Sequence, residues 1–234
     1  MNHVALILDG NRRWAVENGY PVIEGYRRGA ERVRQIVTHA IKRGVPVLTM
    51  YFFSTENWAR TPQEISELFS FMQDFLRDNI DSMVQEGIKL CYLGRQDRLP
   101  SNLRRAIQSS LDKTASGESI ILNIALDYGG RDEILRAIER LMERHEKEGD
   151  IVNEQNFKEC LDIPTTPDPD LVIRTGGEMR VSNFLLWQIA YSELFFIKTL
   201  WPDFTNDDFD LALLEYQNRS RRRGGNGQSL SRSV

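Results

Sequence analysis

Short runs of β-branched and aliphatic residues alternate with longer segments of helical periodicity along most of this 234-residue chain. Such alternation is typical of α/β domains, in which helices flank a mostly parallel sheet. The predicted strands are Val4–Asp9, Val45–Phe53, Ile88–Gly94, Ser119–Leu126, Asp170–Arg174 and Leu194–Ile197. The predicted helices lie near 24–43, 62–86, 100–115, 131–147, 153–161, 183–190 and 205–222. We therefore expect an α/β fold.

Length and composition indicate a single domain. Apolar residues make up 41% of the chain and charged residues 27%, which are ordinary values for a globular protein. The first 220 residues contain no internal repeat and no linker, so residues 1–220 are predicted to form one domain. The stretch 221–234 is rich in Ser, Gly and Arg and is predicted to be a flexible basic tail.

Charge and cysteine content exclude several classes of protein. The formal net charge of −4 argues against a general nucleic-acid-binding protein, because such proteins need a broad basic face. Cys91 and Cys160 lie far apart and support neither a disulfide framework nor a cysteine zinc site. The start of the sequence lacks a signal-peptide pattern, and no run of about 18 apolar residues occurs. We expect a cytoplasmic protein with at most peripheral membrane contact.

The first predicted strand leads into DGNRRW, residues 9–14, which places a carboxylate, a glycine and two arginines at a strand-to-helix turn. Ligands of open parallel sheets bind beyond the carboxyl ends of the strands. Gly10 would let backbone N–H groups approach an anion, and Asp9 could hold a magnesium ion through its hard oxygen ligands. A turn stabilised by Asp9, with Arg12 and Arg13 in solvent, explains the same residues equally well.

A second polar segment follows the strongly apolar strand that ends near Phe53. Ser54, Asn57 and Arg60 offer hydroxyl, amide and guanidinium groups in one loop, on the same edge of the predicted sheet as Asp9. A role in starting the next helix, at Pro62, is the alternative explanation of this segment.

A third polar segment surrounds a Gly-Gly turn after another predicted strand. Its groups are Arg174, Arg180 and Ser182, which suit bidentate binding of phosphate oxygens. Glu193 lies further along the chain and could act near a metal or simply occupy a surface turn. Three strand-end loops rich in phosphate-binding groups, on a chain without net positive charge, predict a small polyphosphate ligand.

Six segments together resemble the undecaprenyl diphosphate synthase, or cis-prenyltransferase, family. They are LILDGNRRWA, FFSTENWAR, LNIALDYGGRDEI, DLVIRTGGEMRVSNFLLWQIAYSELFF, WPDF and RRRGG. The resemblance covers essentially the whole chain. It implies a six-stranded, mostly parallel sheet surrounded by helices, a homodimer and an apolar tunnel. It also implies a Mg²⁺-dependent reaction that joins isopentenyl diphosphate to an allylic diphosphate and leaves a Z double bond.

The resemblance implies a role for each matching residue. Asp9 would be the catalytic, magnesium-binding carboxylate, with support from Glu193. The allylic diphosphate would contact Gly10, Asn11, Arg12, Arg13 and Trp14. The loop that closes over both substrates would contain Ser54, Asn57, Trp58 and Arg60. Asn11 and Asn57 would also take part in catalysis. Isopentenyl diphosphate would contact Arg174, Arg180 and Ser182. The tail residues Arg222, Gly224 and Gly225 would reach across the dimer.

Three positions depart from the long-chain bacterial pattern of the family. Tyr26 stands where those members commonly have a histidine, and Val22 where they have an arginine, for which Arg27 or Arg28 could compensate. Phe52 stands where they typically have an alanine that faces the tunnel. The resemblance therefore favours a short-to-medium product of C15 to C35. The alternative is a long-chain undecaprenyl diphosphate synthase that makes a cell-wall lipid carrier.

Other classes of function fit the sequence less well. A non-catalytic partner subunit of the same fold would be expected to have lost its carboxylate and phosphate-binding residues, yet Asp9, Asn11, Arg174 and Arg180 are present. A nucleic-acid or membrane-surface module could use the basic tail, but the acidic balance of the remainder argues against it. Trans-prenyltransferases use paired DDxxD motifs, whereas residues 207–210 read DDFD and are predicted to begin a helix.

Overall fold

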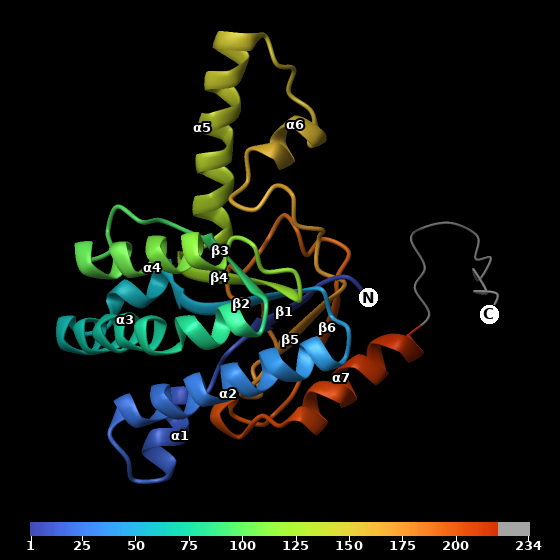
Figure 1. The fold of residues 1–234 in the computed structure, drawn as a ribbon. Helices are drawn as coiled ribbons and strands as arrows, with labels where there is room; N and C mark the ends of the chain where they lie inside the picture. The colour runs from blue at the N-terminus through green and yellow to red at the C-terminus, as the bar shows by residue number, and fades with distance from the viewer. Residues whose placement is uncertain (220–234) are drawn as a thin grey trace.

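Six strands form one sheet in the order β3-β4-β2-β1-β5-β6, and every pairing between them is parallel (Figure 1). The structure is a computed structural model that describes residues 1–219. The strands are β1 (Val4–Ile7), β2 (Val47–Ser54), β3 (Ile88–Leu93), β4 (Ile120–Tyr128), β5 (Leu171–Arg174) and β6 (Glu193–Phe196). The six predicted strands are all confirmed, and only their ends differ by one or two residues.

Helices connect most of the strands, and within residues 1–219 six of the seven predicted helices are confirmed, while the helix Asn11–Glu17 was not predicted. They are α1 (Asn11–Glu17), α2 (Val22–Lys42), α3 (Pro62–Gln85), α4 (Ser101–Thr114), α5 (Gly130–Glu148), α6 (Glu154–Glu159) and α7 (Asn206–Asn218). Two 3-10 turns, η1 (Thr55–Ala59) and η2 (Trp201–Asp203), complete the chain. Local sequence explains the helix ends: Pro62 starts α3 behind a Thr61 side chain that accepts a hydrogen bond from the Glu64 amide, and Gly149 ends α5 in a left-handed conformation.

The main hydrophobic core lies between one face of the sheet and helices α2, α3, α4 and α7. Alternate strand residues such as Leu6, Leu48 and Leu122 point into it, and so do Ile36 of α2 and Leu68 of α3. All five side chains are at most 3% exposed. Burial of this apolar stripe, which the spacing in residues 65–83 predicts, fixes α3 against the sheet.

Non-helical chain covers much of the opposite face of the sheet. Phe184 and Leu185 are fully buried there against β-strand residues that include Tyr51 and Tyr128. The predicted helix over 183–190 is wrong, because this segment consists of turns and bends. Ser182, Asn183 and Leu185 have positive φ angles of 47°, 62° and 46°, which a right-handed helix does not allow.

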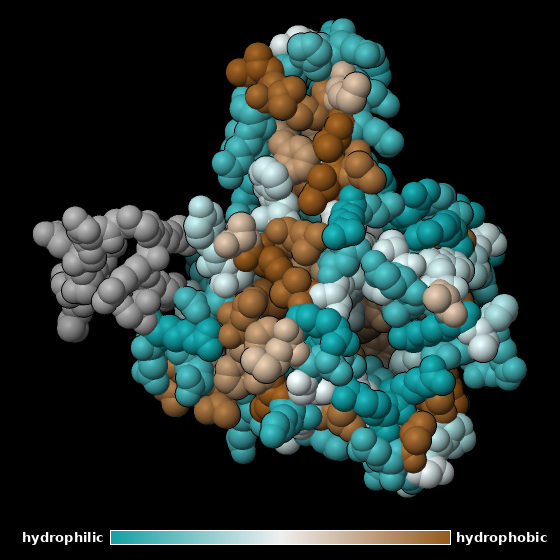
Figure 2. Space-filling model, turned by 180° about the vertical axis from the view of Figure 1, so that it is seen from behind, coloured by the Kyte–Doolittle hydropathy of each residue, from teal (hydrophilic) through white to brown (hydrophobic). Residues whose placement is uncertain are grey.

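Helix α5 projects away from the sheet, and the short α6 packs against it (Figure 1). A small separate core of Ala137, Leu141, Phe157, Cys160 and Leu161 holds the two helices together. Hydrophobic side chains also gather on the surface of this projection and continue onto the body below it (Figure 2). Within residues 1–219, no helix is long and apolar enough to cross a membrane. The predicted tail, with Arg222, Gly224 and Gly225, lies outside the described residues.

Candidate active site

The loops that follow β1, β2 and β5 meet at the carboxyl edge of the sheet, around a cavity of about 770 Å³. The three strands are neighbours or next neighbours in the sheet, so residues far apart in sequence converge here. Ten of the residues predicted for the site line this cavity. They are Asp9, Gly10, Asn11, Arg12, Arg13, Ser54, Asn57, Arg60, Arg174 and Ser182. The prediction that three polar loops share one edge of the sheet is thus confirmed.

Asp9 is the central carboxylate of the cavity and is held by two arginines. Arg174 Nη2 lies 2.8 Å from Asp9 Oδ2, and Arg13 Nη2 lies 3.2 Å from Asp9 Oδ1. Arg174 also donates to the Ser182 hydroxyl at 2.7 Å and is only 4% exposed. A buried guanidinium needs such partners, so β1, β5 and the 175–182 loop are tied together at this point.

The turn after Asp9 depends on a glycine. Gly10 has a φ of 118°, and a Cβ at this position would lie 2.9 Å from three atoms of Leu200. Gly10 therefore provides both the left-handed turn and the close approach that bring α1 to the cavity. Asn11, the first residue of α1, donates to the Leu8 carbonyl at 3.1 Å, while its Oδ1 is buried and has no partner within residues 1–219.

The loop after β2 folds into the turn η1, which its own side chains stabilise. Asn57 Oδ1 accepts a hydrogen bond from the Ser54 amide at 3.0 Å, in a reciprocal capping arrangement. Trp58 faces away from the cavity: its indole donates to buried Asp127 at 2.8 Å and packs against Phe53. Trp58 therefore does not line the cavity, because its side chain anchors the loop from behind.

Tyr26 lies at the edge of the cavity between two charged side chains. Its hydroxyl donates to Glu64 Oε1 at 3.0 Å and accepts from Arg60 Nη1 at 2.6 Å. Burial raises the pKa of Tyr26 to about 12, and the neighbouring Arg60 offsets only part of that effect. This tyrosine stays protonated at neutral pH and orients Arg60 toward the cavity.

A second, apolar cavity of about 100 Å³ adjoins the polar one. Both are lined by Leu8, Asn11, Tyr26, Tyr51 and Phe52. The apolar cavity then runs between the sheet and helix α3, where Met72 and Phe75 line it. Phe69, also on α3, packs instead against Phe53 and Trp58.

Besides Trp58, three predicted site residues within residues 1–219 do not line the polar cavity. Trp14 is buried away from it, donates to Asp203 at 2.9 Å and stacks on Tyr20. The Arg180 side chain is exposed and pairs with Glu178, two residues earlier in the chain. The contact of Arg180 with Arg174 is made by its backbone carbonyl, which accepts a hydrogen bond from the Arg174 guanidinium.

Glu193 is the third of these residues. It is the first residue of β6 and lies opposite Leu171, at the other end of β5 from Arg174 and Asp9. Its carboxylate pairs with Arg219 at 2.8 Å. A single chain therefore does not bring Glu193 and Asp9 together, because the length of β5 separates them. In the part of the chain that the structure describes, no three His, Cys, Asp or Glu side chains form a metal-binding group.

The structure also adds residues that our sequence reasoning missed. Arg131, Asn183 and Glu56 all line the polar cavity. A signal for Arg131 was present, because the sequence Gly129-Gly130-Arg131 follows a strand in the same way as the three segments that were recognised. Asn183 lay inside the segment that was wrongly expected to be a helix.

Comparisons with known proteins agree with this geometry. Residues 7–224 match the Prenyltransf family model, described as undecaprenyl diphosphate synthase. The isoprenyl transferase of Aquifex aeolicus is 44% identical over 222 residues, which cover 95% of each chain. The isoprenyl transferase of Bacillus cereus is 43% identical over 227 residues, covering 95% of this chain and 88% of the relative.

Two solved structures share the fold. Lavandulyl diphosphate synthase from Lavandula x intermedia, in complex with dimethylallyl diphosphate, superposes with a TM-score of 0.90 at 35% identity and covers 94% of this chain and 97% of its own. A Campylobacter jejuni protein described as a probable undecaprenyl diphosphate synthase gives a TM-score of 0.82 at 32% identity, over 96% and 99% of the two chains. With a family match along nearly its whole length, this chain belongs to the undecaprenyl diphosphate synthase family of prenyltransferases.

Proposed function

We propose that this chain is a cis-prenyltransferase that condenses isopentenyl diphosphate with an allylic diphosphate. The observation that carries the proposal is the junction of two cavities, one lined by arginines and Asp9 and the other by apolar side chains. A prenyl diphosphate has the same division into an anionic head and a hydrocarbon chain. The complex of the similar lavandulyl diphosphate synthase with dimethylallyl diphosphate supports a ligand of this class.

The two diphosphates are assigned to opposite sides of the polar cavity. Arg174 and Ser182, already joined by a hydrogen bond, would hold isopentenyl diphosphate. Gly10, Asn11 and the two arginines at the start of α1 would hold the allylic diphosphate, beside the entrance of the apolar cavity that Asn11 also lines. Guanidinium groups suit this task because each can donate two parallel hydrogen bonds to phosphate oxygens.

In the proposed reaction, the C3=C4 double bond of isopentenyl diphosphate attacks C1 of the allylic partner. The bond between C1 and the diphosphate oxygen breaks, and a proton leaves C2 to form the new Z double bond. Arg13 and Arg12 would stabilise the negative charge on the leaving diphosphate. We infer that a diphosphate oxygen accepts the proton, aligned by Asn11 or Ser54. Tyr26 is a poor base because its pKa is raised to about 12.

The donor set around Asp9 fits Mg²⁺. This ion usually takes one or two carboxylates together with substrate phosphates and water, and does not need a cage of protein ligands. Asp9 would hold the ion together with the diphosphate oxygens. When bound, Mg²⁺ would supply positive charge that reduces the repulsion between the two diphosphates and stabilises the negative charge that develops on the leaving group.

We propose a short-to-medium product, from C15 to C35. Phe52 lines both cavities and stands at the entrance of an apolar space of only about 100 Å³. Overfilling a packed site costs about 1–3 kcal/mol, which opposes further growth of the chain. A long-chain undecaprenyl diphosphate synthase remains the alternative, and the product sizes of the wild-type enzyme distinguish the two.

We also propose that the protein acts in the cytoplasm as a homodimer. Leu135, Ile138 and Met142 stand three and four residues apart on α5 and are 63%, 41% and 59% exposed. This spacing gives one apolar stripe on the projecting helix, on a surface where Figure 2 shows hydrophobic side chains gathered. A second copy of the chain is the partner that this stripe would pack against.

Incubation of the purified protein with labelled isopentenyl diphosphate tests the proposal. Extractable labelled product should form only when an allylic diphosphate and Mg²⁺ are both present. Chelation of the metal should stop the reaction, and added Mg²⁺ should restore it. A protein that binds both diphosphates yet forms no product under any of these conditions would instead be a non-catalytic partner subunit.

A further inference from the structure

The first turn of α5 is held tightly against the polar cavity. It follows β4, whose carboxyl end lies at the same edge of the sheet as the ends of β1 and β2. A Cβ on Gly129 would lie 2.5 Å from Thr55 Oγ1, and one on Gly130 would lie 2.8 Å from Leu186 Cγ. Only glycines let α5 start this close to both η1 and the turn segment after Ser182.

Hydrogen bonds fix the backbone at this point. Asn183 accepts from the Gly130 amide through its carbonyl at 2.6 Å and from the Arg131 amide through its Oδ1 at 2.9 Å. The Asn183 side chain also donates to Glu56 at 2.8 Å. Although burial opposes it, this hydrogen bond and others hold the pKa of Glu56 below its usual range. Arg131 is therefore placed at the cavity by contacts from two other loops.

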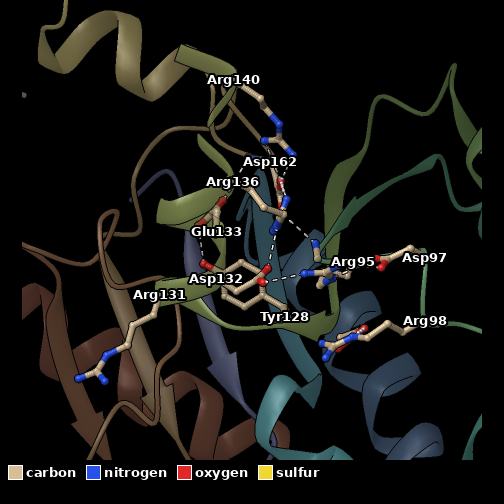
Figure 3. Close-up of polar contacts among 12 residues, drawn as sticks. Arg95, Asp97, Arg98, Tyr128, Arg131, Asp132, Glu133, Arg136, Arg140 and Asp162 are labelled. Carbon is tan, nitrogen blue, oxygen red and sulfur yellow. Dashed lines mark hydrogen bonds and ion pairs between the residues drawn. The ribbon is translucent and has the colours of Figure 1, made fainter. Parts of the chain in front are cut away.

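The arginines near Arg131 in the fold pair with aspartates, whereas Arg131 does not. In Figure 3, Arg95, Arg98, Arg136 and Arg140 point toward aspartates, whereas Arg131 extends away from them. Arg136 pairs with Asp162 at 2.6 Å, Arg98 pairs with Asp127, and Arg95 and Arg140 also have aspartate partners. These four arginines stabilise the fold and have little charge left for a ligand.

Arg131 also differs from the other arginines that line the cavity. Arg13 and Arg174 pair with Asp9, at 3.2 Å and 2.8 Å, and Arg12 and Arg60 pair with Glu64, at 3.7 Å and 3.4 Å. Among residues 1–219, the Arg131 guanidinium has no hydrogen-bond or ion-pair partner. Within residues 1–219, no carboxylate pairs directly with this positive charge at the cavity.

We propose that Arg131 is a further diphosphate-binding residue, and that it contacts the isopentenyl diphosphate held by Arg174 and Ser182. This inference rests on the proposed function. Asn183, which fixes the Arg131 backbone, directly follows Ser182, so Arg131 lies on the Arg174 side of the cavity. A diphosphate has more oxygens than Arg174 and Ser182 can contact as hydrogen-bond donors. An unpaired guanidinium on this side of the cavity supplies two further donors and one positive charge.

Direct binding measurements test this role. Isopentenyl diphosphate is titrated calorimetrically in the absence of an allylic partner, so that no reaction occurs. We expect Arg131→Gln to raise the Kd about ten- to hundredfold, as for loss of a charge-assisted contact, and to raise the KM for isopentenyl diphosphate similarly. Arg131→Lys should recover part of the affinity, because it keeps the charge but not the paired donors. The KM for the allylic diphosphate should stay unchanged.

Arg105→Gln on the exposed face of α4 is the matched control, because it removes the same charge outside the cavity. An unchanged Kd in Arg131→Gln relative to this control would overturn the proposal, and so would an effect confined to the allylic diphosphate. If wild-type protein binds isopentenyl diphosphate but makes no product, the proposed function fails while the comparison of Kd values still tests Arg131. Inorganic pyrophosphate is the probe if isopentenyl diphosphate does not bind.

Discussion

Asp9 accepts contacts from two arginines at the end of β1, and Arg174 is the more buried of the two. Removing its carboxylate would take away the proposed metal ligand, so Asp9→Ala should lower turnover by several orders of magnitude, roughly 10³-fold or more. Asp9→Asn is the matched variant, because its amide oxygen still accepts from Arg174 and protects the fold. Steady-state kinetics and thermal unfolding measure the two effects. Near-wild-type turnover in a folded Asp9→Asn protein would remove Asp9 from the mechanism.

Tyr26 is expected to position Arg60 and not to transfer a proton. Tyr26→Phe removes the hydroxyl that accepts from Arg60 at 2.6 Å but leaves the ring beside the apolar cavity. We expect a moderate rise in KM, with most of kcat retained and with its pH profile between 6 and 9 unchanged. If single-turnover experiments show that chemistry is abolished while both substrates still bind, the tyrosine takes part in the proton transfer.

His3 directly precedes β1 and is buried, with an exposed fraction of 1%. Its Nδ1 donates to the Pro167 carbonyl at 2.7 Å, so its Nε2 accepts from the Thr49 hydroxyl at 2.6 Å. Burial lowers the pKa of His3 to about 4, and the carbonyl of Pro167 offsets part of this effect.

The unfolded chain takes up the His3 proton near pH 6.5, whereas the folded chain does so only near pH 4. Protonation therefore favours the unfolded chain as the pH is lowered from 6.5 to 4. At about 1.4 kcal/mol per pKa unit, the free energy of unfolding should fall by about 3 kcal/mol over this range. Urea unfolding of wild-type protein and His3→Asn at pH 7, 5.5 and 4 measures the difference. The variant should lose less stability than the wild type over this range, and equal losses would show that His3 is not the group responsible.

At the scale of helices and strands, local pattern predicted most of the structure. The six strands are short runs rich in aliphatic or aromatic residues, and α3 combines a proline start with a regular apolar stripe. The segment 183–190 misled the prediction because its apolar residues pack against Tyr51 and Tyr128 from a non-helical backbone. Such packing depends on distant strands and leaves no local periodic signal.

The position of the candidate site was also predictable from local sequence, but the direction of some of its side chains was not. Rules for strand ends placed Asp9, Ser54 and Arg174 at one edge, because parallel strands expose their carboxyl ends together. They could not show that Trp14 and Trp58 turn away, since each indole finds a carboxylate, Asp203 or Asp127, that only the tertiary fold supplies. Contacts made across the sheet decide where a side chain points.

The end of β2 should control product length. Phe52 lines both cavities, so Phe52→Ala should open the passage and shift products longer, and Phe52→Leu should do so less. Each additional isoprene unit gains roughly 3–4 kcal/mol when its carbons are fully buried. Chromatographic sizing with excess isopentenyl diphosphate measures the change. Phe69→Leu is the control, because Phe69 packs against Phe53 and does not line the apolar cavity. An unchanged distribution in Phe52→Ala would assign length control to another residue.

At the scale of the whole molecule, two layers of the fold supply the two halves of the site. The carboxyl edge of the sheet carries the arginines and Asp9, while the space between the sheet and α3 provides the apolar cavity. The chain has a net charge of −4, so it attracts anions through a local group of arginines and not through its overall charge. Asp9 holds two of these arginines, Arg13 and Arg174, in place. This division matches a ligand with a charged head and an apolar chain.

The configuration of the new double bond tests this account most directly. The wild-type protein is given Mg²⁺, isopentenyl diphosphate and an allylic diphosphate primer, and the product is dephosphorylated and examined by NMR. We predict that every double bond formed by the enzyme is Z, in chains between C15 and C35. A product with E double bonds formed by the enzyme would contradict the proposed cis-prenyl transfer at this cavity.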